Sequence, residues 1–178
     1  MRALLAPLAS LAFLAFAGAA AADPVTIAPV AFSEDFETQL IEDFGEREGP
    51  VLKSYIERAL TSALRNAGAD VGAPGGVTVE VTLLEAAVTK PTMEQLSRQL
   101  SLDYSGSVSV GGAELVGVLR APDGRILAEV NHRRFAWSLA DTSLGGSWGD
   151  ARRSIRLFAA KVARAYRSQL SSAELVPA

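Results

Sequence analysis

The 178-residue sequence contains no cysteine and a single histidine, His132. The missing cysteines exclude disulfide bonds, a thiolate metal site, a thiol nucleophile and a lipid-modified cysteine at the N-terminus. A zinc site needs several His or Cys ligands, which one histidine cannot supply. We therefore expect no bound metal and no cofactor.

The sequence also lacks a complete motif for enzyme chemistry. Residues 145–149 match the Gly-x-Ser-x-Gly pattern, which in hydrolases exposes a serine hydroxyl, here that of Ser147, for attack on a carbonyl. Such a serine needs a histidine base, and His132 lies upstream of it instead of far downstream. We expect a non-enzymatic protein in which this segment is a glycine-rich turn.

Carboxylates are concentrated in residues 33–48, which hold seven acidic side chains and one arginine. Calcium-binding loops need carboxylates at alternating positions with a turn glycine, and that order is absent. We predict an exposed, mostly irregular loop without a cation.

The N-terminus has the three parts of a secretory signal peptide. A basic start is followed by the apolar run 3–17, and Ala20 and Ala22 are placed for cleavage before Asp23. Residues 1–22 therefore predict export to the periplasm. An uncleaved segment would be about long enough to anchor the chain in a membrane.

Residues 23–170 are predicted to form one α/β domain, followed by a flexible tail over 171–178. Alternating or continuous apolar residues indicate strands, and apolar residues at three- and four-residue spacing indicate amphipathic helices. The expected elements are a strand over 25–32 with an edge or bulge at Pro29, helices over 49–68, 93–100 and 150–170, and strands over 77–83, 108–120 and from 126 onward. This order predicts a two-layer sandwich, with a mixed sheet of about four to five strands and two main amphipathic helices on one face.

The last strand changes its apolar phase. Ile126 and Val130 occupy even positions, whereas Phe135, Trp137 and Leu139 occupy odd positions. A strand changes phase only through an extra residue, so we predict a bulge among residues 131–134.

Charge is divided unevenly along the chain. Residues 23–85 contain 12 acidic and 4 basic side chains, whereas residues 86–178 contain 8 acidic and 12 basic ones. We expect the two halves to face each other and partly neutralise their charges. The alternative is a bipolar surface that steers a charged partner.

Six side chains are candidates for contact with a ligand or partner. Cationic groups in the last strand could bind an anion, a loop tryptophan could stack on a ligand, and the arginine-rich last helix could lie on anionic lipid. The candidates are His132, Arg133, Arg134, Trp148, Arg153 and Arg156.

Three segments carry a family resemblance: residues 90–92 (Lys-Pro-Thr), 105–115 (Ser-Gly-Ser-Val-Ser-Val-Gly-Gly-Ala-Glu-Leu) and 123–128 (Asp-Gly-Arg-Ile-Leu-Ala). With the element order, they resemble small Gram-negative periplasmic proteins and lipoproteins of largely uncharacterised function. These are similar in fold to penicillin-binding-protein activator lipoproteins and the N-terminal domain of TolB. The resemblance implies binding of envelope proteins without catalytic residues. This chain lacks the lipidated cysteine of the lipoprotein members.

We therefore expect a periplasmic accessory protein that binds another envelope component and no nucleic acid. The expected contact surfaces are a sheet edge near residues 25–32 and the loop 141–150, because an unpaired edge can accept a partner strand. The alternatives are a small-molecule or anion binder, and a protein attached to the membrane surface through its arginine-rich helix. The sequence leaves the oligomeric state open.

Overall fold

The computed structural model describes residues 23–174, so the predicted signal peptide and the last four residues lie outside the described part. In chain order the elements are β1 (Pro24–Ile27), β2 (Ala31–Phe32), α1 (Glu34–Gln39), the π-helical turn η1 (Leu40–Phe44), α2 (Glu48–Asn66), β3 (Asp70–Val71), β4 (Val77–Ala87), α3 (Met93–Arg98), β5 (Gly112–Arg120), β6 (Ile126–Phe135), the 3-10 turn η2 (Leu139–Asp141) and α4 (Gly149–Glu174).

The strands form one mixed, open sheet in the order β3-β1-β4-β5-β6, with β2 also paired to β4. The pairs β1–β3, β1–β4 and β2–β4 are parallel, whereas β4–β5 and β5–β6 are antiparallel. The mixed α/β class is confirmed. The predicted strand number was too low, since the sheet has six strands and two of them contain only two residues.

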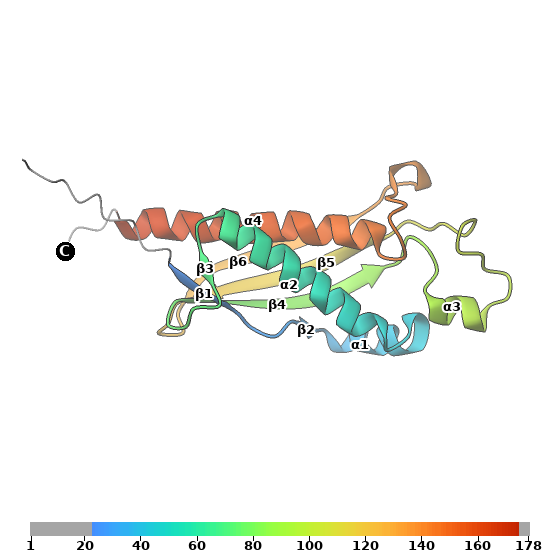
Figure 1. Ribbon diagram of the computed structural model, residues 1–178, viewed down its shortest axis with the longest axis horizontal. Helices are drawn as coiled ribbons and strands as arrows, with labels where there is room; N and C mark the ends of the chain where they lie inside the picture. The colour runs from blue at the N-terminus through green and yellow to red at the C-terminus, as the bar shows by residue number, and fades with distance from the viewer. Residues whose placement is uncertain (1–22, 175–178) are drawn as a thin grey trace, which may run out of the picture.

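The core lies between the sheet and the two long helices, α2 and α4, which contact each other (Figure 1). Alternate residues of the strands and one face of each helix are buried there, as the sequence periodicity predicts. The fully buried side chains include Val79, Leu83, Leu115 and Leu119 from the sheet, Leu52, Ile56, Leu60 and Leu64 from α2, and Phe158, Val162 and Tyr166 from α4.

The prediction of an irregular loop over 33–48 was wrong, because this segment folds into α1 and η1. The Ser33 hydroxyl caps α1 by accepting a hydrogen bond from the Phe36 backbone N–H. Phe36, Leu40 and Phe44 recur every four residues and are all buried. This apolar spacing was the available signal, and the seven surrounding carboxylates obscured it.

The predicted bulge in the last strand was also wrong. The pairing of β6 with β5 continues without interruption from Ala128 to Phe135, and the register shift lies at the other end of the pair, between Leu119 and Arg120. Trp137 is 92% exposed. No bulge is required, because the odd-numbered aromatic residues do not enter the core.

The predicted exposed edge near residues 25–32 applies to little of that segment. Strand β1 lies between β3 and β4, and Val25 is completely buried. Strand β2 lies beside β4 but contains only two residues. The register with β4 does change by one residue between β1 and β2, on either side of Pro29, as the expected irregularity there implies. The long free edge of the sheet is β6.

Two local predictions are confirmed in detail. Helix α3 begins with a reciprocal capping box, in which the Thr92 side chain accepts from the Gln95 backbone and the Gln95 side chain accepts from the Thr92 backbone. The turn at residues 122–124 joins β5 to β6 as a hairpin.

Helix α4 continues to Glu174, so the first part of the predicted tail is helical.

Candidate functional site

A pocket of about 530 Å³ lies beside the free edge of β6, between this strand and α4. We call it the edge pocket. Its lining includes three of the predicted residues, His132, Arg133 and Arg134, together with Trp137 and Lys161. The lining contains three permanent cations, of which only Lys161 has no carboxylate partner among the described residues, so Lys161 is the group that would attract an acidic occupant.

The main chain of β6 directs hydrogen-bonding groups away from β5 along this edge. Residues of an antiparallel strand point their N–H and C=O groups alternately toward and away from the neighbouring strand. The Asn131 carbonyl accepts a hydrogen bond from Lys161 Nζ at 3.4 Å, and the Ala136 N–H bonds Gly111 across the ladder. Odd-numbered residues of β6 therefore direct their main-chain groups outward.

His132 is 8% exposed, and its Nε2 atom has no hydrogen-bond partner among the described residues. Burial, followed by the nearby charges of Lys161 and Arg134, lowers the pKa of His132 below the ordinary value of 6.5. The imidazole is therefore neutral at pH 7. The single histidine lines the pocket as an uncharged polar group among cations.

Because the pKa of His132 is lowered in the folded protein, the stability of the fold should decrease as the pH falls. The unfolded chain binds a proton at His132 below about pH 6.5, whereas the folded chain does so only at lower pH. The contribution of His132 to stability is therefore fully present above pH 6.5 and is lost as the pH falls toward the folded pKa. We expect His132→Gln to flatten the decline in Tm between pH 7.5 and pH 5.5. The His132 NMR titration, unambiguous in a one-histidine chain, should give a midpoint below 6.5, and a midpoint at or above 6.5 contradicts this account.

The arginines near the edge pocket are held by acidic partners. On the face of the sheet away from α4, Arg133 pairs with Glu114 at 2.7 Å and with Glu85 at 3.1 Å. Its pKa is raised by these two hydrogen bonds. Arg134 and Arg153 both pair with Asp141, at 3.4 and 3.5 Å. This last contact ties the predicted loop 141–150 to β6 and to α4.

The other predicted residues lie elsewhere. Trp148 is 3% exposed, packs edge-on against Phe44 at 5.1 Å, and donates from Nε1 to Glu48 at 2.7 Å. It does not offer a ring to a partner. Arg156 lines a separate pocket between α2 and α4. The Ser147 hydroxyl donates to the Pro91 carbonyl, so it joins two loops.

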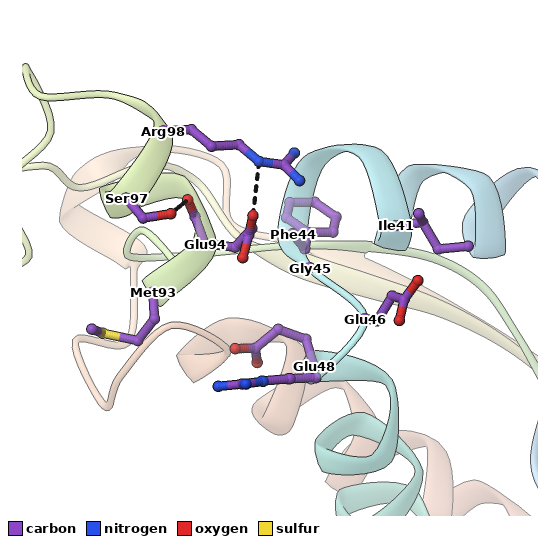
Figure 2. A pocket seen from close by; sticks show the side chains of 10 residues that line it. Ile41, Phe44, Gly45, Glu46, Glu48, Met93, Glu94, Ser97 and Arg98 are labelled. Atoms are coloured by element: carbon purple, nitrogen blue, oxygen red, sulfur yellow. Dashed lines mark hydrogen bonds and ion pairs between the residues drawn. The ribbon is translucent and has the colours of Figure 1, made fainter.

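A pocket of about 630 Å³ lies where η1, the start of α2 and α3 meet. Figure 2 shows Glu94 and Arg98 of α3 paired with each other beside Gly45. Gly45 has a φ of 95°, and a Cβ there would lie 2.8 Å from the Cβ of Glu94. Glu48 is bound to Trp148. The polar groups here mainly hold the chain segments together, so we treat this pocket as a structural junction.

Residues 23–174 contain neither a cluster of metal ligands nor a helix that could span a membrane. No group of three or more His, Asp or Glu side chains there could hold a metal ion. None of the helices in this range combines the length and the apolar composition that crossing a membrane requires.

Comparison with solved structures shows what the fold is similar to. A Xanthomonas campestris protein of the DUF330 family matches with a TM-score of 0.50 and 12% identity, covering 87% of this chain and 89% of that chain. A minor lipoprotein from Acinetobacter baumannii matches with a TM-score of 0.34 and 10% identity, covering 88% and 98%. The first similarity concerns the fold alone.

Comparison at the level of sequence places the chain in a family. No curated protein matches significantly. The model of DUF3313, described as a protein of unknown function, matches residues 9–162, which is most of the chain. The chain therefore belongs to the DUF3313 family.

Proposed function

We propose that this chain is a non-enzymatic, exported accessory protein of the cell envelope that binds a partner protein at the edge of β6. The partner contributes an extended segment that carries acidic and apolar side chains and adds to the sheet as a further strand. The observation that carries the proposal is the ten-residue strand β6, which has a neighbouring strand on one side only and leads to the exposed Trp137.

The geometry of the edge supports strand addition. The outward main-chain groups of β6 can form a second ladder with an added strand. Trp137 is 92% exposed and Leu157 is 44% exposed, and both line the edge pocket. Large exposed apolar groups beside a free strand provide the contact area that main-chain bonds alone lack.

The charge of the edge pocket supports an acidic segment. Lys161 lines the pocket without a carboxylate partner among the described residues, whereas Arg133 and Arg134 are already paired with acidic side chains. Opposite charge on the partner would steer its approach and fix the register of the added strand.

The signal-like residues 1–22 and the resemblance of the sequence to envelope proteins support export. Export is tested by the mature N-terminus: we expect a chain that begins at Asp23 in a periplasmic extract. Recovery of the intact chain from the cytosol contradicts it.

Partner binding is tested by photo-crosslinking in the native cells. A photoreactive residue at position 137 should give a discrete adduct with one protein, whereas the same residue at Leu100, which is 99% exposed, should not. Asn131→Pro removes an outward N–H from the edge strand and keeps the ladder to β5, so it should reduce the adduct at least tenfold.

Asn131→Thr is the matched control, because it keeps the N–H and should leave the adduct unchanged. An adduct that persists in Asn131→Pro, or that forms equally from position 100, contradicts strand addition. The melting temperature of each variant is measured to show that the fold is retained.

A further inference from the structure

Helices α2 and α4 contact each other (Figure 1). A further pocket, of about 540 Å³, lies between them, and no residue of β6 lines it. We call it the α2–α4 pocket. It is lined by Tyr55 and Arg58 from α2 and by Arg152 and Arg156 from α4. The lining contains three guanidinium groups and no carboxylate, although the whole chain has 20 acidic and 17 basic residues.

The guanidinium groups of this pocket have no ion-pair partner among the described residues. The arginines at 98, 120, 125, 133, 134 and 153 pair with carboxylates. Arg58, Arg152 and Arg156 do not, and among the described residues they share this with the arginines at 47, 65, 164 and 167, none of which lines the α2–α4 pocket. Like charges gathered at one place repel each other, and an anion between them relieves that repulsion.

The tyrosine orders two of these cations. The Tyr55 ring centroid lies 4.8 Å from the Cζ atom of Arg152 and 5.3 Å from that of Arg58. Guanidinium groups over an aromatic face are attracted by the ring and keep their N–H groups free for a ligand. Arg58 and Arg152 come from different helices, so the two donors converge only in the folded protein.

The rest of the lining leaves room for a ligand and adds polar groups. Ala59 and Ala63 are small, and Ser62 and Asn66 present a hydroxyl and an amide. A neighbouring pocket of about 550 Å³ shares Arg58, Ser62 and Asn66 with the α2–α4 pocket and adds Arg65, but Glu57 also lines it. Of these two pockets, only the α2–α4 pocket has a lining without a carboxylate.

We propose that the α2–α4 pocket binds a phosphoryl group. Guanidinium groups bind phosphoryl oxygens in a bidentate way, and a phosphoryl group has enough oxygens to bond several arginines at once. A single carboxylate has only two oxygens and satisfies fewer of the donors. The phosphoryl group can belong to a soluble phosphorylated compound or to the head group of an anionic lipid.

The first arm of the test is calorimetric titration of the purified protein with inorganic phosphate at low salt. We expect measurable binding of phosphate and at least tenfold weaker binding of acetate. The double variant Arg152→Gln/Arg156→Gln, and separately Arg58→Gln on the other helix, should weaken phosphate binding at least tenfold. Equal binding of acetate and phosphate overturns the assignment to a phosphoryl group.

The matched control is Arg164→Gln/Arg167→Gln, which removes the same charge from the same helix outside the pocket lining. It should change phosphate binding less than twofold. If this control weakens binding as strongly as the pocket variants, net charge explains the effect and the site is overturned.

The second arm is flotation with vesicles of phosphatidylglycerol or of phosphatidylcholine. If the protein floats with phosphatidylglycerol vesicles but not with phosphatidylcholine vesicles, and the pocket variants do not float, the ligand is a lipid head group. Phosphate binding without flotation identifies a soluble phosphorylated compound. The absence of both phosphate binding and flotation overturns the proposal. The substituted residues do not line the edge pocket. Failure of the phosphoryl-binding proposal can therefore be distinguished from failure of partner binding at β6.

Discussion

Replacing Gly117 with alanine should destabilise the protein, and removing the Phe158 ring should cancel most of that effect. Both positions lie where α4 packs on β5. A Cβ at position 117 would lie 2.8 Å from Cζ of Phe158, whose side chain is completely buried. The ring cannot shift into solvent, so we expect Gly117→Ala to cost about 1–3 kcal/mol.

Phe158→Ala should have the larger single effect, because it leaves a cavity in the middle of the core. Truncation of a buried phenylalanine costs about 3–5 kcal/mol. For a chain of this length that corresponds to a decrease in Tm of roughly 10 °C. In the double variant, the new methyl group occupies part of the vacated space. We therefore expect a favourable coupling of about 1–2 kcal/mol between the two substitutions.

The coupling is measured as a double-mutant cycle from urea unfolding curves. The control pairs Gly117→Ala with Phe44→Ala, since Phe44 packs against Trp148 instead. This second pair should be additive. If Gly117→Ala lowers the free energy of unfolding equally with and without the Phe158 ring, the close approach of α4 is not the reason for glycine. The backbone conformation would then be the reason.

Asp150→Ala should be the most destabilising change of a polar side chain. Asp150 is 5% exposed at the start of α4, and Thr89 is completely buried. Asp150 Oδ1 accepts the Ser143 N–H at 2.8 Å, and Oδ2 accepts the Thr89 hydroxyl at 3.0 Å. Alanine would leave two donors without acceptors and would remove a negative charge from the helix N-terminus. We expect a loss of about 2–4 kcal/mol.

Asp141→Ala is the matched control, because this carboxylate also has two partners, Arg134 and Arg153, but lies at the surface. Its side chain is 36% exposed, so its ion pairs are screened by water and salt. We expect a cost below about 1 kcal/mol. Asp150→Asn keeps one acceptor oxygen and should give an intermediate value. Equal losses for Asp141→Ala and Asp150→Ala would refute the role assigned to burial.

Sequence reasoning found the elements whose signals are local. The apolar faces of α2 and α4, the alternation in β4, the capping box at Thr92 and the turn at residues 122–124 each depend on neighbours a few residues apart. It missed α1 and η1, although Phe36, Leu40 and Phe44 have helical spacing. These three side chains are buried because α2 and β4 pack over them. The number of carboxylates in the segment gives no information about that packing.

Among the candidate site residues, the sequence placed His132, Arg133 and Arg134 together simply because they are adjacent. It placed Trp148 correctly in the loop before α4 and named it as a candidate for ligand contact, but the ring is buried against Phe44 and its Nε1 is bonded to Glu48. Trp137, two residues beyond the end of β6, was predicted as an apolar strand residue and not as a contact residue. Exposure of a tryptophan depends on which distant segments pack on it, and no local pattern encodes that.

The sequence alone determined the types of the main elements and the faces they bury, because side-chain periodicity follows from the backbone geometry of each element. Only the tertiary structure decided which strand is the free edge and which arginines share a pocket. Strand order and the crossing of α2 over α4 arise from contacts between residues far apart in the chain. The edge of β6 and the meeting of Arg58 with Arg152 are consequences of that packing.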